Sequence, residues 1–168
     1  MIGGTFSNRP VKDTLYVSFD QLDQYVSLES SITQIISQNT SLQEILIDIS
    51  DYSLQSEDII YPIAASEKNT LRGEFHVLEK WRYPYWKKNG KLYVPSDKNP
   101  IGTYLIILAD LQKQDKIPIS IHEWPKAPYT THDFRKGDFS KGCIRMRPDD
   151  ISTFFNSLEI GAKVIIQN

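Results

Sequence analysis

Short segments in which apolar and polar residues alternate recur along this chain, and they constrain its fold more than any other feature. Such alternation is typical of a half-buried strand, because successive side chains point to opposite faces of a sheet. One segment, residues 103–109, is instead apolar on both faces, as expected of a central buried strand. Residues 51–56 are predicted to form a turn, and Pro62 places its own strand at an edge or a bulge. Further strands are predicted over residues 14–19, 44–49, 58–64, 73–78, 117–121 and 162–166.

Two segments show the apolar spacing of three and four residues that indicates a helix. The first follows Asp20, a candidate N-cap, and runs to about Ile36. The second starts at Pro148, which suits the first helical position, and ends before Gly161. We predict that both helices pack against the sheet rather than bind a ligand.

The length suits one domain with a short extension, and the composition narrows the possible classes of binding partner. The chain has 168 residues, 40% of them hydrophobic and 24% charged, with a net charge of −2, so no general affinity for nucleic acid is implied. No apolar run is long enough to cross a bilayer. One cysteine and three dispersed histidines argue against a structural zinc site, and we predict no cofactor. A single cysteine also cannot form an internal disulfide, which leaves a free thiol.

That cysteine, Cys143, directly follows Gly142, and His122 ends the strand predicted at residues 117–121. A thiol nucleophile needs a neighbour that takes or stabilises its proton, because the thiolate is the reactive form. Main-chain amides around a glycine turn can hold an oxyanion. A solitary cysteine is more often buried and inert, and His132 competes with His122 for the role of base.

These residues resemble a known family. The segment Ser140-Lys141-Gly142-Cys143-Ile144-Arg145 is similar to the S-x-G-C-[IV]-R signature of the L,D-transpeptidase (YkuD-type) catalytic domain, in which a strand-ending histidine precedes the signature. Further similar motifs follow in the same order over roughly the last three quarters of the chain, which makes the resemblance more specific than any one motif. They are Gly73-Glu74-Phe75, Asn99-Pro100-Ile101-Gly102-Thr103-Tyr104, residues 147–151 and residues 161–164.

The resemblance implies a mostly β, sandwich-like fold with one or two packing helices and an active site in a groove between the sheets. Residues 1–40 would form an N-terminal extension with a loose lead-in, a short strand and a packing helix, and residues 41–168 would form the catalytic domain. It implies that His122 takes the proton of Cys143, which forms a thioester with a peptidoglycan stem tetrapeptide and passes it to an acceptor amine. Gly142 and Ser140 would shape the oxyanion turn. Arg145, Lys141, His132, Tyr85 and Trp86 are candidate substrate contacts.

One departure from the family pattern is Glu123, which follows His122 where relatives usually have Gly or Ser. In a strand its side chain should point to the opposite face, so it would hold the imidazole through its main chain.

Several alternatives stay open at this point. Water as the acceptor would make the chain an L,D-carboxypeptidase, and it could also be a secreted wall-targeting enzyme or an inactive peptidoglycan-binding module. The basic and aromatic residues between 81 and 95 could bind single-stranded nucleic acid, but a packed loop or a peptide groove fits the net charge better. We expect a monomer in the periplasm or cell envelope with its signal peptide trimmed, since the first residues lack a basic flank and an apolar stretch.

Overall fold

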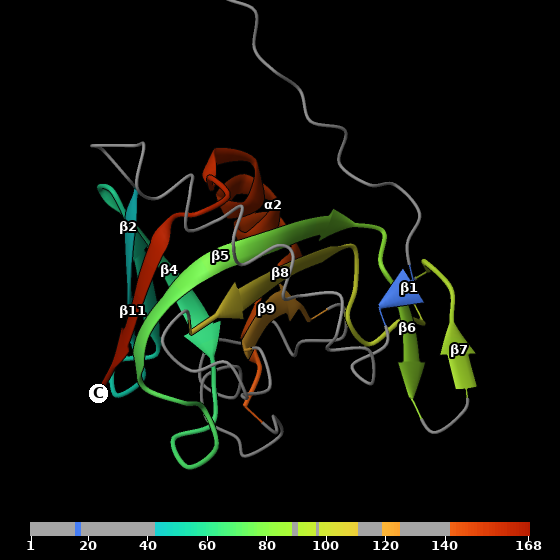
Figure 1. The fold of residues 1–168 in the computed structure, drawn as a ribbon, viewed down its shortest axis with the longest axis horizontal. Coiled ribbons are helices and arrows are strands. Elements are labelled where there is room, and N and C mark those ends of the chain that lie inside the picture. The colour runs from blue at the N-terminus through green and yellow to red at the C-terminus, as the bar shows by residue number, and fades with distance from the viewer. Residues whose placement is uncertain (1–15, 18–42, 89–90, 97, 111–118, 125–141) are drawn as a thin grey trace, which may run out of the picture.

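The computed structural model describes residues 16–17, 43–88, 91–96, 98–110, 119–124 and 142–168. Eight of the described strands form a closed ring with the order β10-β4-β3-β2-β11-β5-β8-β9 (Figure 1). Their bounds are β2 Glu44–Asp48, β3 Ser53–Ser56, β4 Ile59–Ala64, β5 Gly73–Arg82, β8 Tyr104–Ala109, β9 Ile119–Glu123, β10 Ile144–Met146 and β11 Lys163–Gln167. The mostly β prediction is therefore confirmed. The resemblance implied a sandwich of two facing sheets. In the structure, hydrogen bonds also join the edges of these sheets, so the strands close into a ring.

The ring encloses an apolar core, to which the helix α2 (Pro148–Ser157) adds its buried face. Phe154 is fully buried, with its ring 5.8 Å from that of Tyr61, and the ring of Phe155 lies 5.0 Å from that of Tyr104. The helix begins as predicted, at Pro148, because proline has no N–H to leave unsatisfied there. The helix predicted after Asp20 lies outside the described residues.

Strand β8 is buried on both faces, which confirms the expectation for residues 103–109. Ile106 and Leu108 point into the enclosed core. Leu105 and Ile107 point the other way, into a second apolar cluster that also contains Leu78, Trp81 and Ile101. This outer cluster, defined by these five residues, covers the outside of the ring at the strands that carry the candidate site.

The predicted turn at residues 51–56 is wrong in part, because it contains β3, which pairs with β2 and β4. Only Leu54 in β3 is a buried apolar residue, so the sequence offers almost no alternating pattern there. The turns on either side are tight, with Tyr52 at φ 52° and Glu57 at φ 55°. The predicted strands around 44–49, 58–64, 73–78, 103–109, 117–121 and 162–166 are confirmed as β2, β4, β5, β8, β9 and β11.

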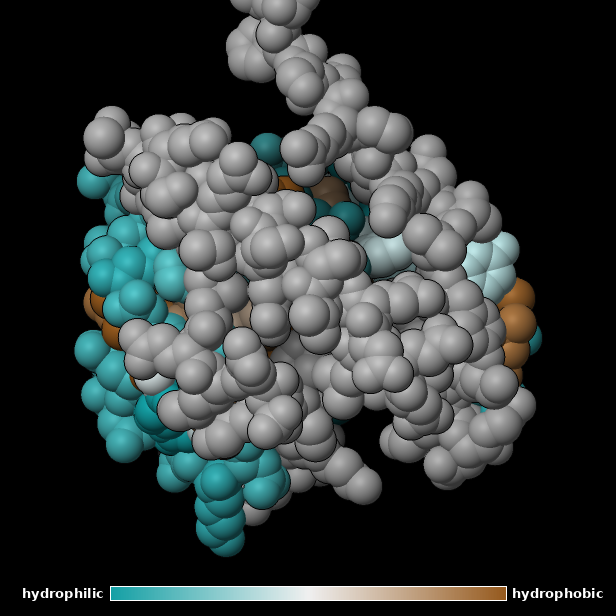
Figure 2. All heavy atoms as spheres, viewed as in Figure 1, coloured by the Kyte–Doolittle hydropathy of each residue, from teal (hydrophilic) through white to brown (hydrophobic). Residues whose placement is uncertain are grey.

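A separate three-stranded sheet lies to one side of the ring (Figure 1) and consists of β1 (Tyr16–Val17), β6 (Tyr85–Lys88) and β7 (Lys91–Tyr93). The strand predicted over residues 14–19 is thus seen as β1, which pairs with β6 in parallel. Figure 2 shows apolar side chains on the surface at this end of the molecule, where Leu92 is 46% and Val94 is 52% exposed.

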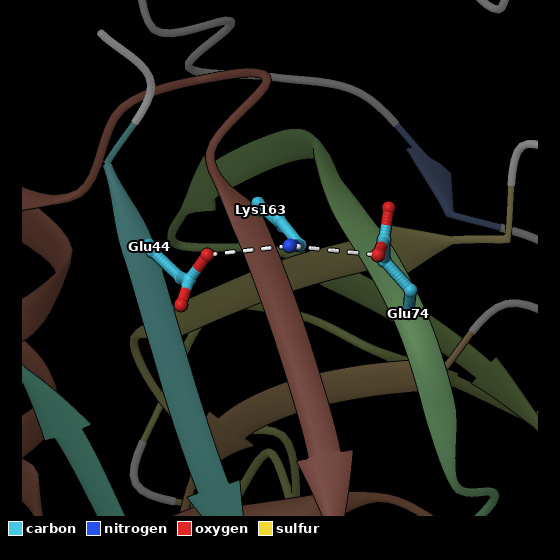
Figure 3. Close-up of polar contacts among 3 residues, drawn as sticks. All are labelled: Glu44, Glu74 and Lys163. Carbon is cyan, nitrogen blue, oxygen red and sulfur yellow. Dashed lines mark ion pairs between the residues drawn. The ribbon is translucent and has the colours of Figure 1, made fainter.

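The outer face of the opposite part of the ring is polar and salt-bridged. Lys163 on β11 lies between two strands, with its Nζ 3.2 Å from Glu44 on β2 and 3.5 Å from Glu74 on β5 (Figure 3). Its hydrogen bond to Glu44 raises the pKa of Lys163, and the negative charges of Glu44 and Glu74 act in the same direction. This cluster contains no nucleophile, and the candidate nucleophile and base belong instead to the segments of β9 and β10.

Candidate active site

The segments that carry the candidate nucleophile and base lie side by side because β9 and β10 are parallel neighbours. In their register Ile144 lies beside Ile121, and Arg145 lies beside His122. Ile121 and Ile144 are fully buried in the enclosed core, so the residues that alternate with them face outward. One step back in the same register, Cys143 lies beside Ser120, and its Sγ is 3.2 Å from the Ser120 Oγ.

His122 is buried, with 3% of its surface exposed, and its Nδ1 lies 2.7 Å from the main-chain oxygen of Glu123. A carbonyl oxygen can only accept a hydrogen bond, so Nδ1 donates and carries the proton. In the neutral ring this leaves Nε2 with its lone pair, as a general base requires. The predicted main-chain contact from Glu123 to the imidazole is therefore present.

Burial lowers the pKa of His122 to about 4. The carbonyls of Glu123 and Ile101 oppose this shift in the pKa of His122, while the positive charge of Arg145 adds to it. The ring is consequently neutral at physiological pH and can accept a proton.

Cys143 is a free, half-buried cysteine. Gly142 before it has φ +121°, and a Cβ on it would lie 3.0 Å from the main-chain oxygen of Asn69. Glycine is therefore required here on two grounds, the backbone angle and the close approach of another loop.

Asn69 belongs to the loop between β4 and β5, which the sequence analysis did not connect with the site. The Asn69 N–H donates to Ser66 Oγ at 3.1 Å, and the Ser66 N–H donates to Thr70 Oγ1 at 3.1 Å. Ser66 and Thr70 are both buried, so these bonds fix the loop against Gly142. No pattern in the sequence indicates this contact.

Arg145 lies on the same outward face, and its guanidinium carbon is 5.1 Å from the ring centroid of Trp124. Burial lowers the pKa of Arg145, and the nearby charge of Cys143 opposes that shift. The arginine is thus within electrostatic range of the sulfur, where a cation favours negative charge.

The side chain of Glu123 is buried and ties the end of β9 to the turn before β8. Its Oε2 accepts a hydrogen bond from the Thr103 N–H at 2.6 Å. Gly102 has φ +75°, and a Cβ on it would lie 2.5 Å from the Glu123 Cβ. Asn99, which is fully buried, holds the same turn by accepting from the Ile101 N–H at 3.1 Å.

Of the remaining predicted site residues, two lie in the part of the chain that the structure describes. Trp86 and Tyr85 lie on β6, and Trp86 packs against the outer cluster and against Tyr93, at 5.3 Å between ring centroids. Leu105 of the outer cluster is the strand partner of His122, so Trp86 packs against the cluster that flanks the base. Ser140, Lys141 and His132 lie outside the described residues.

No role was predicted for Ser120 from the sequence, because spacing alone gives the strand face that it shares with His122 and not its contact with Cys143, which depends on the pairing of β9 with β10. A residue two positions before His122 in a strand must share its face.

Within the parts of the chain that the structure describes, no group of three or more His, Cys, Asp and Glu side chains could hold a metal ion. The described helix is also too short and too polar to cross a membrane.

Comparison with known proteins identifies relatives of this chain. In Bacillus subtilis (strain 168), the protein named "Putative L,D-transpeptidase YqjB" is 31% identical over 110 residues, which are 64% of this chain and 58% of that protein. The chain therefore spans less than two thirds of the length of this relative.

Solved structures show the same fold. An L,D-transpeptidase from Mycobacterium tuberculosis H37Rv matches with a TM-score of 0.55 and 19% identity over 76% of this chain and 58% of its own. The Ldtfm–avibactam carbamoyl enzyme matches with a TM-score of 0.58 and 20% identity over 76% and 49%. L,D-transpeptidase 3 from Mycobacterium tuberculosis, in complex with a faropenem-derived adduct, matches with a TM-score of 0.54 and 17% identity over 76% and 60%.

The family model described as the L,D-transpeptidase catalytic domain, YkuD, matches residues 43–166. This range includes the described strands of the closed ring up to Ile166 of β11, together with Cys143 and His122. The chain therefore belongs to the YkuD family of L,D-transpeptidase catalytic domains.

Proposed function

We propose that this chain is a cysteine-dependent L,D-transpeptidase that acts on peptidoglycan stem peptides in the cell envelope. The observation that supports the proposal is the shared outward face of β9 and β10, which carries a half-buried thiol, an oriented imidazole two residues further along the face, and a cation. These are the parts that acyl transfer through a thioester needs.

In the first half-reaction, Nε2 of His122 takes the proton of Cys143, and the sulfur attacks the carbonyl carbon of the last peptide bond of a stem tetrapeptide. The main-chain amides at Gly142 and Cys143 are the candidate donors to the developing oxyanion. The carbon–nitrogen bond then breaks, and the imidazolium returns its proton to the departing amine of D-alanine. The products are a thioester on Cys143 and free D-alanine.

In the second half-reaction, an acceptor amine attacks the thioester and gives its proton to His122. The carbon–sulfur bond breaks, a new amide forms, and the proton passes to the sulfur to regenerate the thiol. Water in place of the amine would release a tripeptide instead, so the products separate transpeptidase from carboxypeptidase activity.

Two solved structures of similar fold, the Ldtfm–avibactam carbamoyl enzyme and an L,D-transpeptidase 3 with a faropenem-derived adduct, suggest the first test. The purified chain is incubated with a carbapenem and examined by intact mass, and separately with a tetrapeptide donor and an amine acceptor. We expect one adduct per chain and a cross-linked product, and we expect Cys143→Ala to lose both. Continued product formation by Cys143→Ala would show that the nucleophile is wrong.

The base is tested by comparing His122→Ala with His132→Ala in the same assays. We expect product formation to fall by about 10²-fold or more in His122→Ala and by much less in His132→Ala. An unaffected His122→Ala variant would assign the base elsewhere. Ser56→Ala is a suitable control, since Ser56 is a buried serine on β3 that hydrogen-bonds with Gln43.

A further inference from the structure

Ser120 places a hydroxyl group directly beside the candidate nucleophile. Its Oγ is 3.2 Å from the Cys143 Sγ, within hydrogen-bond range for sulfur. The serine is 1% exposed and is the second residue of β9, which lies between β8 and β10 in the ring. Its hydroxyl is therefore shielded from water, and among the residues that the structure describes its side chain bonds only with this sulfur.

The position of Ser120 is set by the same pairing that builds the site. Ser120 precedes His122 by two residues in β9, so both side chains lie on the outward face. Ile107 is its partner on β8, and Cys143 lies beside it at the start of β10. The strand pairing holds the hydroxyl close to the sulfur, and no loop movement is needed to bring the two together.

The direction of this hydrogen bond depends on the charge of the sulfur. With a neutral thiol, either group can donate, because both carry a hydrogen. A thiolate has no hydrogen, so the serine must then be the donor. A hydrogen bond to an ionised acceptor is about twice as strong as one between neutral groups, and the contact therefore favours the thiolate.

We propose that Ser120 is a catalytic residue whose hydroxyl donates to the Cys143 thiolate and so stabilises the ionised nucleophile. This deepens the proposed function and rests on it for the role of Cys143. The hydrogen bond weakens once the sulfur is acylated, because a thioester sulfur carries no negative charge. Ser120 thus acts on the free nucleophile before attack and again when the sulfur leaves.

The proposal has a kinetic signature that a purely structural role would not produce. A thiolate that accepts a strong hydrogen bond is more abundant at low pH but intrinsically less nucleophilic, with a Brønsted coefficient of about 0.4–0.5. Removing the hydroxyl should therefore slow alkylation at low pH and speed it at high pH. The two pH profiles should cross.

Cys143 is the only cysteine of the chain, so alkylation by iodoacetamide, followed by intact mass, measures this thiol alone. The rate is measured from pH 5 to pH 10 for the wild type, Ser120→Ala, Ser120→Thr and the control Ser56→Ala. In Ser120→Ala we expect the midpoint of the profile to rise by about one pH unit. The rate below the midpoint should fall by about threefold, and the plateau rate should rise by about threefold.

Ser120→Thr keeps the hydroxyl and should restore the wild-type profile, while Ser56→Ala should leave it unchanged. Ser120→Gly is a second variant without the hydroxyl, and it gives the same comparison should the alanine variant not fold. Superposed profiles of the wild type and the hydroxyl-free variants would overturn the proposal. A pH profile of Ser120→Thr that matches the profile of Ser120→Ala would also overturn the proposal, since the hydroxyl would then have no effect on the alkylation rate.

Alkylation needs no substrate, so this result is independent of turnover. Peptide transfer by Cys143→Ala would refute the proposed function. It would not affect the crossing of the alkylation profiles, which compares the wild type with the Ser120 variants. Loss of transfer in Cys143→Ala together with unshifted profiles would refute only the role of Ser120.

Discussion

The buried imidazole of His122 should make the stability of this protein fall steeply in mild acid. Burial holds the pKa of His122 at about 4 in the folded chain, against 6.5 for an ordinary histidine. Between these two values the unfolded chain binds a proton that the folded chain does not. Proton uptake therefore favours unfolding in this window, and the stability contributed by the neutral ring is lost as the pH falls below about 6.5.

The size of the effect follows from linkage. Each unit of difference in pKa corresponds to about 1.4 kcal/mol, so the loss attributable to His122 is about 2 kcal/mol at pH 5 and about 3 kcal/mol at pH 4. His122 is 3% exposed, so solvent screens its interactions little. A change of this size is a large share of the 5–15 kcal/mol by which a typical domain is stable.

The perturbation that isolates the effect is His122→Asn, because an asparagine amide can still donate to the Glu123 oxygen but does not titrate. Urea unfolding of the wild type and the variant is measured at pH 7, 6, 5 and 4. Other titrating groups, including His76, are present in both proteins and cancel in the difference. The wild type should lose about 3 kcal/mol more than the variant between pH 7 and pH 4. A difference that stays constant over this range would refute the assignment of a buried, neutral imidazole.

Two further predictions concern the glycines of the site. Gly142→Ala should destabilise the fold by about 1–3 kcal/mol in urea unfolding and should slow the formation of the carbapenem adduct. The reason is that the new Cβ would lie 3.0 Å from the Asn69 main-chain oxygen and that Gly142 has a φ of +121°. An unchanged rate of adduct formation would contradict this prediction. Gly102→Ala should lower the free energy of unfolding by about 1–3 kcal/mol, because the new Cβ overlaps the Glu123 side chain. The double variant Gly102→Ala/Glu123→Gly should lose less stability than the two single variants lose together. Additive losses would contradict the contact between the two positions.

The sequence predicted those parts of the fold whose residues carry their own pattern. Residues 103–109 are apolar on both faces, and β8 is buried on both faces accordingly. By contrast, β3 has one buried apolar residue, Leu54, and is a strand because β2 and β4 lie on either side of it. Its structure is set by its neighbours, so no local pattern could have predicted it.

The same distinction applies to the candidate site. Cys143 and His122 were predicted from a motif that surrounds each of them, and the pairing of β9 with β10 brings their segments together. Ser120 and Asn69 contact the segment of the nucleophile only because distant parts of the chain are placed side by side by the closed ring. Contacts of this kind depend on register, and register is fixed by the whole sheet rather than by the residues themselves.

Glu123 shows why a departure from a motif need not change the chemistry. Its main-chain carbonyl orients the imidazole of His122, and any residue at this position supplies a carbonyl. Its side chain points away from the imidazole and accepts from the Thr103 N–H instead, over the space left by Gly102. The larger residue is therefore tolerated after the histidine because a glycine in the preceding turn makes room for it. The base therefore keeps its main-chain hydrogen bond although a large residue follows it.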